Sequence, residues 1–248
     1  MKETQVIMGM PVTVEVADSE DPDLLAEVFR YFRQVDERFS TYKPNSEISR
    51  INRGELAAKE YSPEMAEVLA LSAQTKTETQ DFFDIQTPAG LLDPSGLVKG
   101  WAIFRAAKIL SRAGAQNYYV EAGGDIQTAG RNSQGERWRV GIKNPFQPDK
   151  IIKILQVGSA GIATSGSYER GSHIYNPHSP DDPAKEIISL TVIGPNIYEA
   201  DRFATAAFAM GAKALDFIAQ RPELAGYLVS RTGTAIFTNN LTQYAQLD

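Results

Sequence analysis

The 248-residue chain contains no cysteine and only two histidines. The absence of cysteine excludes disulfides, a thiolate nucleophile and any zinc site that uses cysteine. The two histidines, His173 and His178, lie in loop-like sequence with no third ligand evident, so a histidine zinc site is not expected either.

Positive charge is also scarce, because 25 Lys and Arg oppose 31 Asp and Glu and leave a net charge of −6. Nucleic-acid grooves and anionic membrane patches depend on concentrated positive charge, so neither partner is expected. No run approaches the roughly 18 apolar residues of a membrane span. The N-terminus lacks the apolar core of a signal peptide, so the chain is expected to be cytoplasmic as written, and exported only if a leader was removed.

The order of the secondary-structure signals predicts an α+β fold. "QVIMGMPVTVEV" predicts a strand pair or one bent strand, and a helix is predicted from about Asp23 to Phe39. Ser46 and the Ser62–Pro63 pair mark two more helix starts. Six short strand-like runs lie between residues 117 and 193, and a helix is predicted from about 198 to 221. Because strands and helices do not alternate steadily, mostly antiparallel sheets packed with helices are expected, in a single domain over residues 1–248.

Two glycine-containing stretches have both a structural and a functional interpretation. In "LLDPSGLVKGW", a turn enters a helix whose first turns carry Lys99, an arrangement that attracts anions; the alternative is a plain helix start with Ser95 as cap and Lys99 in solvent. In "VEAGGDIQTAG", Gly-Gly-Asp is first of all a hairpin turn, although glycines also let backbone approach a ligand.

The stretch "GIATSGSYERGSHIYNPHS" gathers small hydroxyl residues, glycines and both histidines. A hydrogen-bonded or surface histidine is the ordinary expectation for His178, and His173 is open between that and a functional role.

The predicted helix near residues 198–215 carries Asp201 and Thr205 one turn apart on a largely apolar face. A helix that is apolar all round is buried, and a buried carboxylate needs a cation or a metal. Carboxylate and hydroxyl oxygens at i and i+4 suit Mg²⁺ shared with substrate phosphates. The alternative is that Asp201 caps the helix and Thr205 bonds back to the carbonyl of residue 201.

Six segments in this order resemble the ApbE family, the FAD:protein FMN transferases, from Met8 to about Gly211. They are "MGM", "FSTYKPNSEISRIN", "LDPSGLVKGWAIFRAAKIL", "YYVEAGGDIQTAG", "IATSGSYERGSHIYNP" and "EADRFATAAFAMG". The resemblance implies an ApbE-like (T-fold-like) α+β architecture, FAD as substrate and Mg²⁺ at its diphosphate.

The resemblance also implies roles for individual residues. It assigns the metal ligands to Asp201, Thr205 and a backbone oxygen at Gly96. It assigns flavin contacts to Met10 or its neighbour Met8, Tyr42, Asp93, Lys99 and the backbone near Tyr175. His173 and Asp125 match family positions, and each is a candidate for the catalytic base.

The implied reaction is attack by a Thr or Ser hydroxyl of an acceptor flavoprotein on the FMN-side phosphorus of FAD, with release of AMP. Two alternatives are hydrolysis of FAD to FMN and AMP, and non-catalytic storage or sensing of flavin. The loop after His173 departs from the family pattern at Asn176 and His178, which bears on acceptor docking. The sequence predicts neither the identity of the acceptor nor an oligomeric state.

Overall fold

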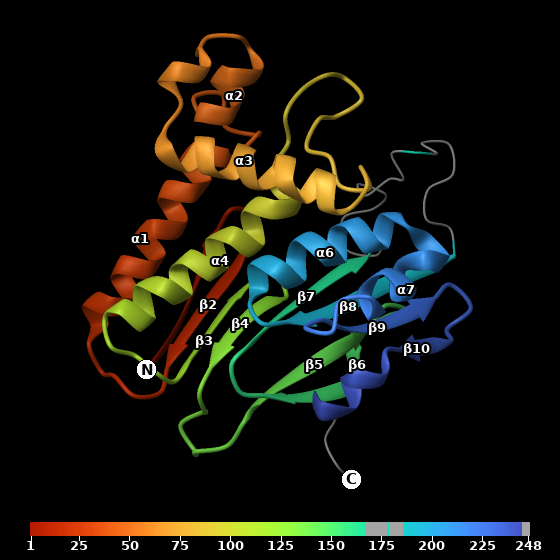
Figure 1. Ribbon diagram of the computed structural model, residues 1–248. Helices are drawn as coiled ribbons and strands as arrows, with labels where there is room; N and C mark the ends of the chain where they lie inside the picture. The colour runs from red at the N-terminus through yellow and green to blue at the C-terminus, as the bar shows by residue number, and fades with distance from the viewer. Residues whose placement is uncertain (167–177, 179–185, 245–248) are drawn as a thin grey trace.

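The computed structural model describes residues 1–166, 178 and 186–244. An eight-stranded sheet, antiparallel throughout, forms the centre of the molecule (Figure 1). In spatial order its strands are β1 (Lys2–Ile7), β2 (Met10–Val16), β3 (Tyr118–Ala122), β4 (Asp125–Ala129), β7 (Ala160–Gly166), β8 (Ile187–Gly194), β9 (Ala225–Ser230) and β10 (Ala235–Phe237). The predicted α+β class with mostly antiparallel sheet is confirmed.

Helices cover one face of this sheet, and a separate two-stranded hairpin packs on the other (Figure 1). The helices are α1 (Pro22–Phe39), α2 (Glu47–Asn52), α3 (Pro63–Glu78), α4 (Ser95–Arg112), α6 (Ile197–Ala209) and α7 (Ala214–Ala219). The hairpin consists of β5 (Trp138–Asn144) and β6 (Gln147–Val157). Short 3₁₀ turns lie at Ala58–Glu60, Gly211–Lys213 and Asn239–Tyr244.

Strand alternation divides the core into two layers. On β8, Leu190 and Val192 point into the helical layer, whereas Ile193 points toward the hairpin. Successive side chains of a strand point to opposite faces, so a sheet buried on both sides has apolar residues at consecutive positions. This explains why "IISLTVI" is apolar at most of its positions.

The predicted helix starts agree with the structure, because the capping side chains lie where the sequence places them. Ser46 and Ser62 accept hydrogen bonds from backbone N–H groups in the first turns of α2 and α3. The β1–β2 strand pair and the β3–β4 hairpin are also confirmed.

The prediction of one continuous helix from about residue 198 to 221 is wrong. Helix α6 ends at Ala209, and Gly211 has φ +60° in the 3₁₀ turn before α7. A left-handed residue cannot continue a right-handed helix, so Gly211 divides the apolar stretch into two helices.

Candidate functional site

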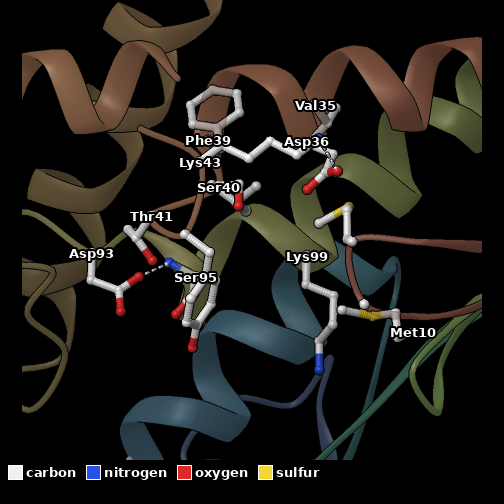
Figure 2. Close-up of a pocket in the computed structure, with 14 residues that line it drawn as sticks. Met10, Val35, Asp36, Phe39, Ser40, Thr41, Lys43, Asp93, Ser95 and Lys99 are labelled. Carbon is white, nitrogen blue, oxygen red and sulfur yellow. Dashed lines mark hydrogen bonds and ion pairs between the residues drawn. The ribbon is translucent and has the colours of Figure 1, made fainter. Parts of the chain in front are cut away.

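A cavity of about 530 Å³ opens between the β1–β2 turn, the end of α1 with the loop after it, and the start of α4 (Figure 2). Its lining residues are Met8, Gly9, Met10, Val35, Asp36, Phe39, Ser40, Thr41, Tyr42, Lys43, Asp93, Ser95, Val98 and Lys99. Four of the predicted flavin contacts, Met10, Tyr42, Asp93 and Lys99, therefore line one cavity although they come from separate segments. Tyr175 lies outside the described residues.

Two tight turns shape the wall of the cavity near Met10. Met8 and Gly9 have φ of 58° and 72°, the left-handed geometry of a two-residue hairpin turn, and this turn brings Met10 back beside the cavity. In the second turn, a Cβ on Gly123 would lie 2.8 Å from Met10 Sδ. Glycine at position 123 is therefore what leaves room for the Met10 side chain.

The start of α4 is held by Asp93, not by a capping serine. Ser95 is the first helical residue, and its amide donates to Asp93 Oδ1 at 3.0 Å. The Asp93 amide in turn donates to the carbonyl of Ile85 at 2.7 Å. Ser95 as helix cap, the alternative interpretation of this segment, is therefore wrong, and the helix start carries a carboxylate in a cavity wall.

Lys99, one turn into α4, forms an ion pair with Asp125. Its Nζ lies 2.7 Å from Asp125 Oδ2, and the alternative that placed Lys99 in solvent is wrong because the side chain is only 17% exposed. Asp125 is 1% exposed, and its Oδ1 accepts a hydrogen bond from the Thr164 amide at 3.0 Å. The Gly-Gly-Asp turn thus places a buried carboxylate beside a cation at the cavity.

Asp201 and Thr205 lie on the face of α6 that contacts the first turns of α4. Asp201 Oδ2 accepts from the Gly100 amide at 2.8 Å, and Thr205 Oγ1 donates to the Gly96 carbonyl at 3.3 Å. Asn196 caps α6 instead, through its bond from the Glu199 amide. The alternative in which Asp201 caps the helix and Thr205 bonds back to residue 201 is therefore wrong.

Glycine makes this helix contact possible. A Cβ on Gly100 would lie 2.6 Å from Asp201 Cβ and 2.9 Å from the carbonyl oxygen of Ile197. The side chain of Asp201 therefore lies directly against the backbone of α4, and Gly96, Asp201 and Thr205 present a carbonyl, a carboxylate and a hydroxyl along one seam.

Burial is the main cause of a raised pKa at Asp201. The side chain is withdrawn from water, and the negative charge of nearby Asp125 raises its pKa further. Lys99 and the Gly100 N–H act in the opposite direction, but they do not offset the loss of hydration. A site of this kind favours the binding of a cation, which would stabilise the ionised carboxylate.

Sequence reasoning missed Asp36 and Lys43, which also line the cavity. Lys43 Nζ lies 2.5 Å from Asp36 Oδ2 (Figure 2). It also lies 2.6 Å from Glu37 Oε1, so the Lys43 side chain links the loop after α1 to the helix itself. A signal was present, because Asp36 interrupts an apolar stripe of α1 between Val35 and Phe39.

Of the two histidines only His178 is described. Its Nε2 lies 2.9 Å from the carbonyl oxygen of Gln80, and its ring centroid lies 4.5 Å from that of Phe82. His173, like Asn176, lies outside the described residues. Within residues 1–166, 178 and 186–244, no three or more His, Cys, Asp or Glu side chains cluster as a metal centre would require. None of the helices described there is long and apolar enough to cross a membrane.

Comparison with known proteins places this site in a family. A family model described as "ApbE family" matches residues 8–91 and 86–228. The chain belongs to the ApbE family. All the residues that form the cavity and the α4–α6 seam fall within the matched ranges.

Individual members of the ApbE family are similar over different lengths. The FAD:protein FMN transferase of Haemophilus influenzae is 26% identical, with 99% of this chain and 92% of that protein covered. That of Salmonella typhimurium is 29% identical, but the match covers 63% of this chain and 47% of that protein. The apo flavinyl transferase ApbE of Pseudomonas stutzeri has the same fold, with a TM-score of 0.86 at 23% identity over 100% of this chain and 97% of that one.

Proposed function

We propose that this protein is a Mg²⁺-dependent FAD:protein FMN transferase, which moves FMN from FAD to a Thr or Ser hydroxyl of an acceptor flavoprotein and releases AMP. The observation that carries the proposal is the seam of Gly96, Asp201 and Thr205 next to the cavity lined by Tyr42 and Lys99. Membership of the ApbE family and the names of the relatives support the same activity.

The residues of the seam fit Mg²⁺ by their chemistry. A carbonyl, a carboxylate and a hydroxyl are hard oxygen ligands, and Mg²⁺ in phosphoryl-transfer sites takes few protein ligands because it keeps waters and phosphate oxygens. We assign Asp201, Thr205 and the Gly96 carbonyl as the residues that hold it. When bound, Mg²⁺ supplies neutralisation of the charge that develops on the diphosphate oxygens during transfer.

The cavity residues fit the flavin end of FAD. Tyr42 is 95% exposed at the cavity, so its ring is uncovered and free to stack on an aromatic ligand. Met10, Val35 and Phe39 provide apolar contacts, and the Asp93 carboxylate provides a hydrogen-bond acceptor. The Tyr175 backbone is a further proposed contact that lies outside the described residues.

The reaction needs a group that accepts the proton of the acceptor hydroxyl. The hydroxyl oxygen forms a bond to the FMN-side phosphorus, the bond from that phosphorus to the AMP oxygen breaks, and the hydroxyl proton passes to the base. We assign the base to Asp125 or His173. Lys99, paired with Asp125, orients that carboxylate and offers positive charge to the diphosphate.

A single assay separates this proposal from its two alternatives. The protein is incubated with FAD, Mg²⁺ and an acceptor domain that contains a target Thr, and AMP and the acceptor mass are measured. AMP together with a mass gain of one FMN supports transfer. AMP without the mass gain supports hydrolysis, and bound FAD without AMP supports storage or sensing; either result overturns the transferase.

A further inference from the structure

The residue that follows Asp201 in the chain, Arg202, is nearly fully buried at 5% exposure. Its Nε and Nη2 donate to Glu199 Oε2 at 2.9 and 2.6 Å, and its Nη1 donates to Glu78. Burying a guanidinium is costly unless such partners compensate it. This arrangement therefore holds one side chain at a fixed place between α6 and the last residue of α3.

Aromatic rings fix the plane of the Arg202 guanidinium. Its Cζ lies 4.0 Å from the ring centroid of Phe203 and 5.2 Å from that of Tyr198. Two carboxylates at its edges and rings at its faces leave this side chain little freedom. Three of these partners, Glu199, Phe203 and Tyr198, belong to α6 itself. The Arg202 side chain is therefore held in a fixed position relative to that helix.

A neighbouring face of α6 lies against α4, where Asp201 and Thr205 form hydrogen bonds to the Gly100 amide and the Gly96 carbonyl. There α6 contacts α4 at Gly96 and Gly100, which have no side chains to interlock with it. The hydrogen bond from the Ile197 amide to Gln127 Oε1, at 2.8 Å, fixes the start of the helix on the sheet. Buried side chains such as Ala204 and Phe208 pack α6 into the core, and within that packing the exact placement of the helix decides where Asp201 and Thr205 point.

We infer that Arg202 is a positioning residue: its buried ion pair with Glu78 ties α6 to α3 and contributes to the placement of Asp201 and Thr205 against α4. The role in metal binding rests on the proposed function, whereas the placement of Asp201 does not. Glu78 is the last residue of α3, so the ion pair joins α6 to the helix that precedes α4 in the chain.

The chain offers a matched control in Arg221. Its guanidinium also stacks on Phe203, at 4.8 Å, and on Phe217, at 3.7 Å, but its bonds go to the carbonyls of Phe217 and Glu78. Arg221→Gln therefore removes a stacked cation from the same ring without removing the side-chain ion pair to α3.

The first measurement needs no metal or FAD. The Gly100 amide proton, which donates to Asp201, is followed by NMR in the metal-free protein. We expect Arg202→Gln and Glu78→Gln to move this resonance upfield as the bond to the carboxylate lengthens, whereas Arg221→Gln leaves it in place. An unchanged Gly100 resonance in Glu78→Gln, a variant that keeps Arg202 paired with Glu199, overturns the inference even if Arg202→Gln does not fold.

The second measurement is the affinity for Mn²⁺, used as a probe for Mg²⁺, with saturating FAD and no acceptor. Loss of a partner that orients a metal ligand typically weakens binding by about 10- to 100-fold, and we expect the lower end for Arg202→Gln. Arg202→Lys should recover part of the loss, because one amine can keep one of the two carboxylates. Affinity that falls equally in Arg221→Gln would show general destabilisation and overturn the inference. Absence of Mn²⁺ binding in the unaltered protein would instead contradict the proposed metal site, while the Gly100 resonance still decides the role of Arg202.

Discussion

Helix α4 has two contact faces that follow different rules, although Gly100 and Trp101 are neighbours in the chain. Toward α1, Trp101 packs edge-on against Phe39 with ring centroids 5.5 Å apart, and against Tyr31 at 6.4 Å. Toward α6, the contact consists of Gly96 and Gly100 against Asp201 and Thr205. The first face buries large rings, and the second lets polar side chains touch the backbone.

The comparison shows how one helix can separate stability from function. Burial of aromatic area stabilises the fold, whereas a buried carboxylate with a raised pKa destabilises it in the absence of a ligand. We therefore expect loss of an aromatic ring on the α1 face to lower mainly the stability. Loss of a polar side chain on the α6 face should lower mainly the activity.

The largest effect on stability is expected for Trp101→Ala. Removal of a buried tryptophan typically costs about 3–5 kcal/mol through lost burial and the cavity left behind. Urea denaturation measures this loss, and FAD titration at low temperature should still show binding by the folded fraction. A stable Trp101→Ala variant that had lost FAD affinity would contradict the division between the two faces.

Asp201→Asn is expected to lower activity and to leave the fold intact. If Asp201 is the metal ligand that we propose, Mg²⁺-dependent release of AMP should fall by at least about 100-fold, because a neutral amide replaces a charged carboxylate. Asp216→Asn, which changes an exposed carboxylate on α7, is the control and should retain activity. Full activity in Asp201→Asn would contradict the metal assignment.

Gly100→Ala tests how closely α4 and α6 approach. The added methyl group meets Asp201 and the Ile197 carbonyl, so we expect a loss of about 1–3 kcal/mol in the free energy of unfolding and weaker metal binding. Gly96→Ala is the matched control for stability, because its Cβ comes no nearer than 3.3 Å, to Thr205 Cγ2. Equal losses in the two variants would show that general helix effects, and not this contact, decide the result.

The raised pKa of Asp201 predicts a pH-dependent stability in metal-free protein. The folded state keeps this proton over a pH range in which the unfolded state, with a pKa of about 4, has released it. The stability associated with neutral Asp201 is therefore complete below that value and is lost as the pH rises through the folded pKa. In chelator, the advantage of Asp201→Asn over the unaltered protein should grow between pH 5 and 8, by up to about 1.4 kcal/mol per pH unit. An unchanged difference in the free energy of unfolding between the two proteins from pH 5 to pH 8 would contradict this.

The smallest effect is expected for Lys99→Ala. It should weaken FAD binding by up to about tenfold, because the variant loses the cation that we propose to lie near the diphosphate. Lys108→Ala is the control on the same helix, because Lys108 is exposed and its Nζ lies 5.0 Å from the Phe104 ring. Unchanged FAD affinity in Lys99→Ala would count against its place at the ligand.

Local signals in the sequence were sufficient to predict most helices and strands and the family. The helix starts and the hairpin could be predicted because each depends on residues close together in the chain: Ser46, Ser62 and the Gly123–Gly124 pair. The resemblance to the ApbE family rests on short ordered motifs, and the family match confirms it. The end of α6 was missed because the apolar pattern continues past Gly211, and the sequence does not show that this glycine is left-handed.

Only the tertiary structure decided between the alternatives at the site. Nothing local distinguishes an Asp201 that caps a helix from one whose carboxylate accepts the Gly100 amide, because the two residues are 101 positions apart. The same holds for the Lys99–Asp125 pair and for Arg202 with Glu78. The sequence by itself determined which chemical groups the site can contain. The packing of α4, α6 and the sheet determined which of these groups come into contact, because burial and close approach depend on segments far apart in the chain.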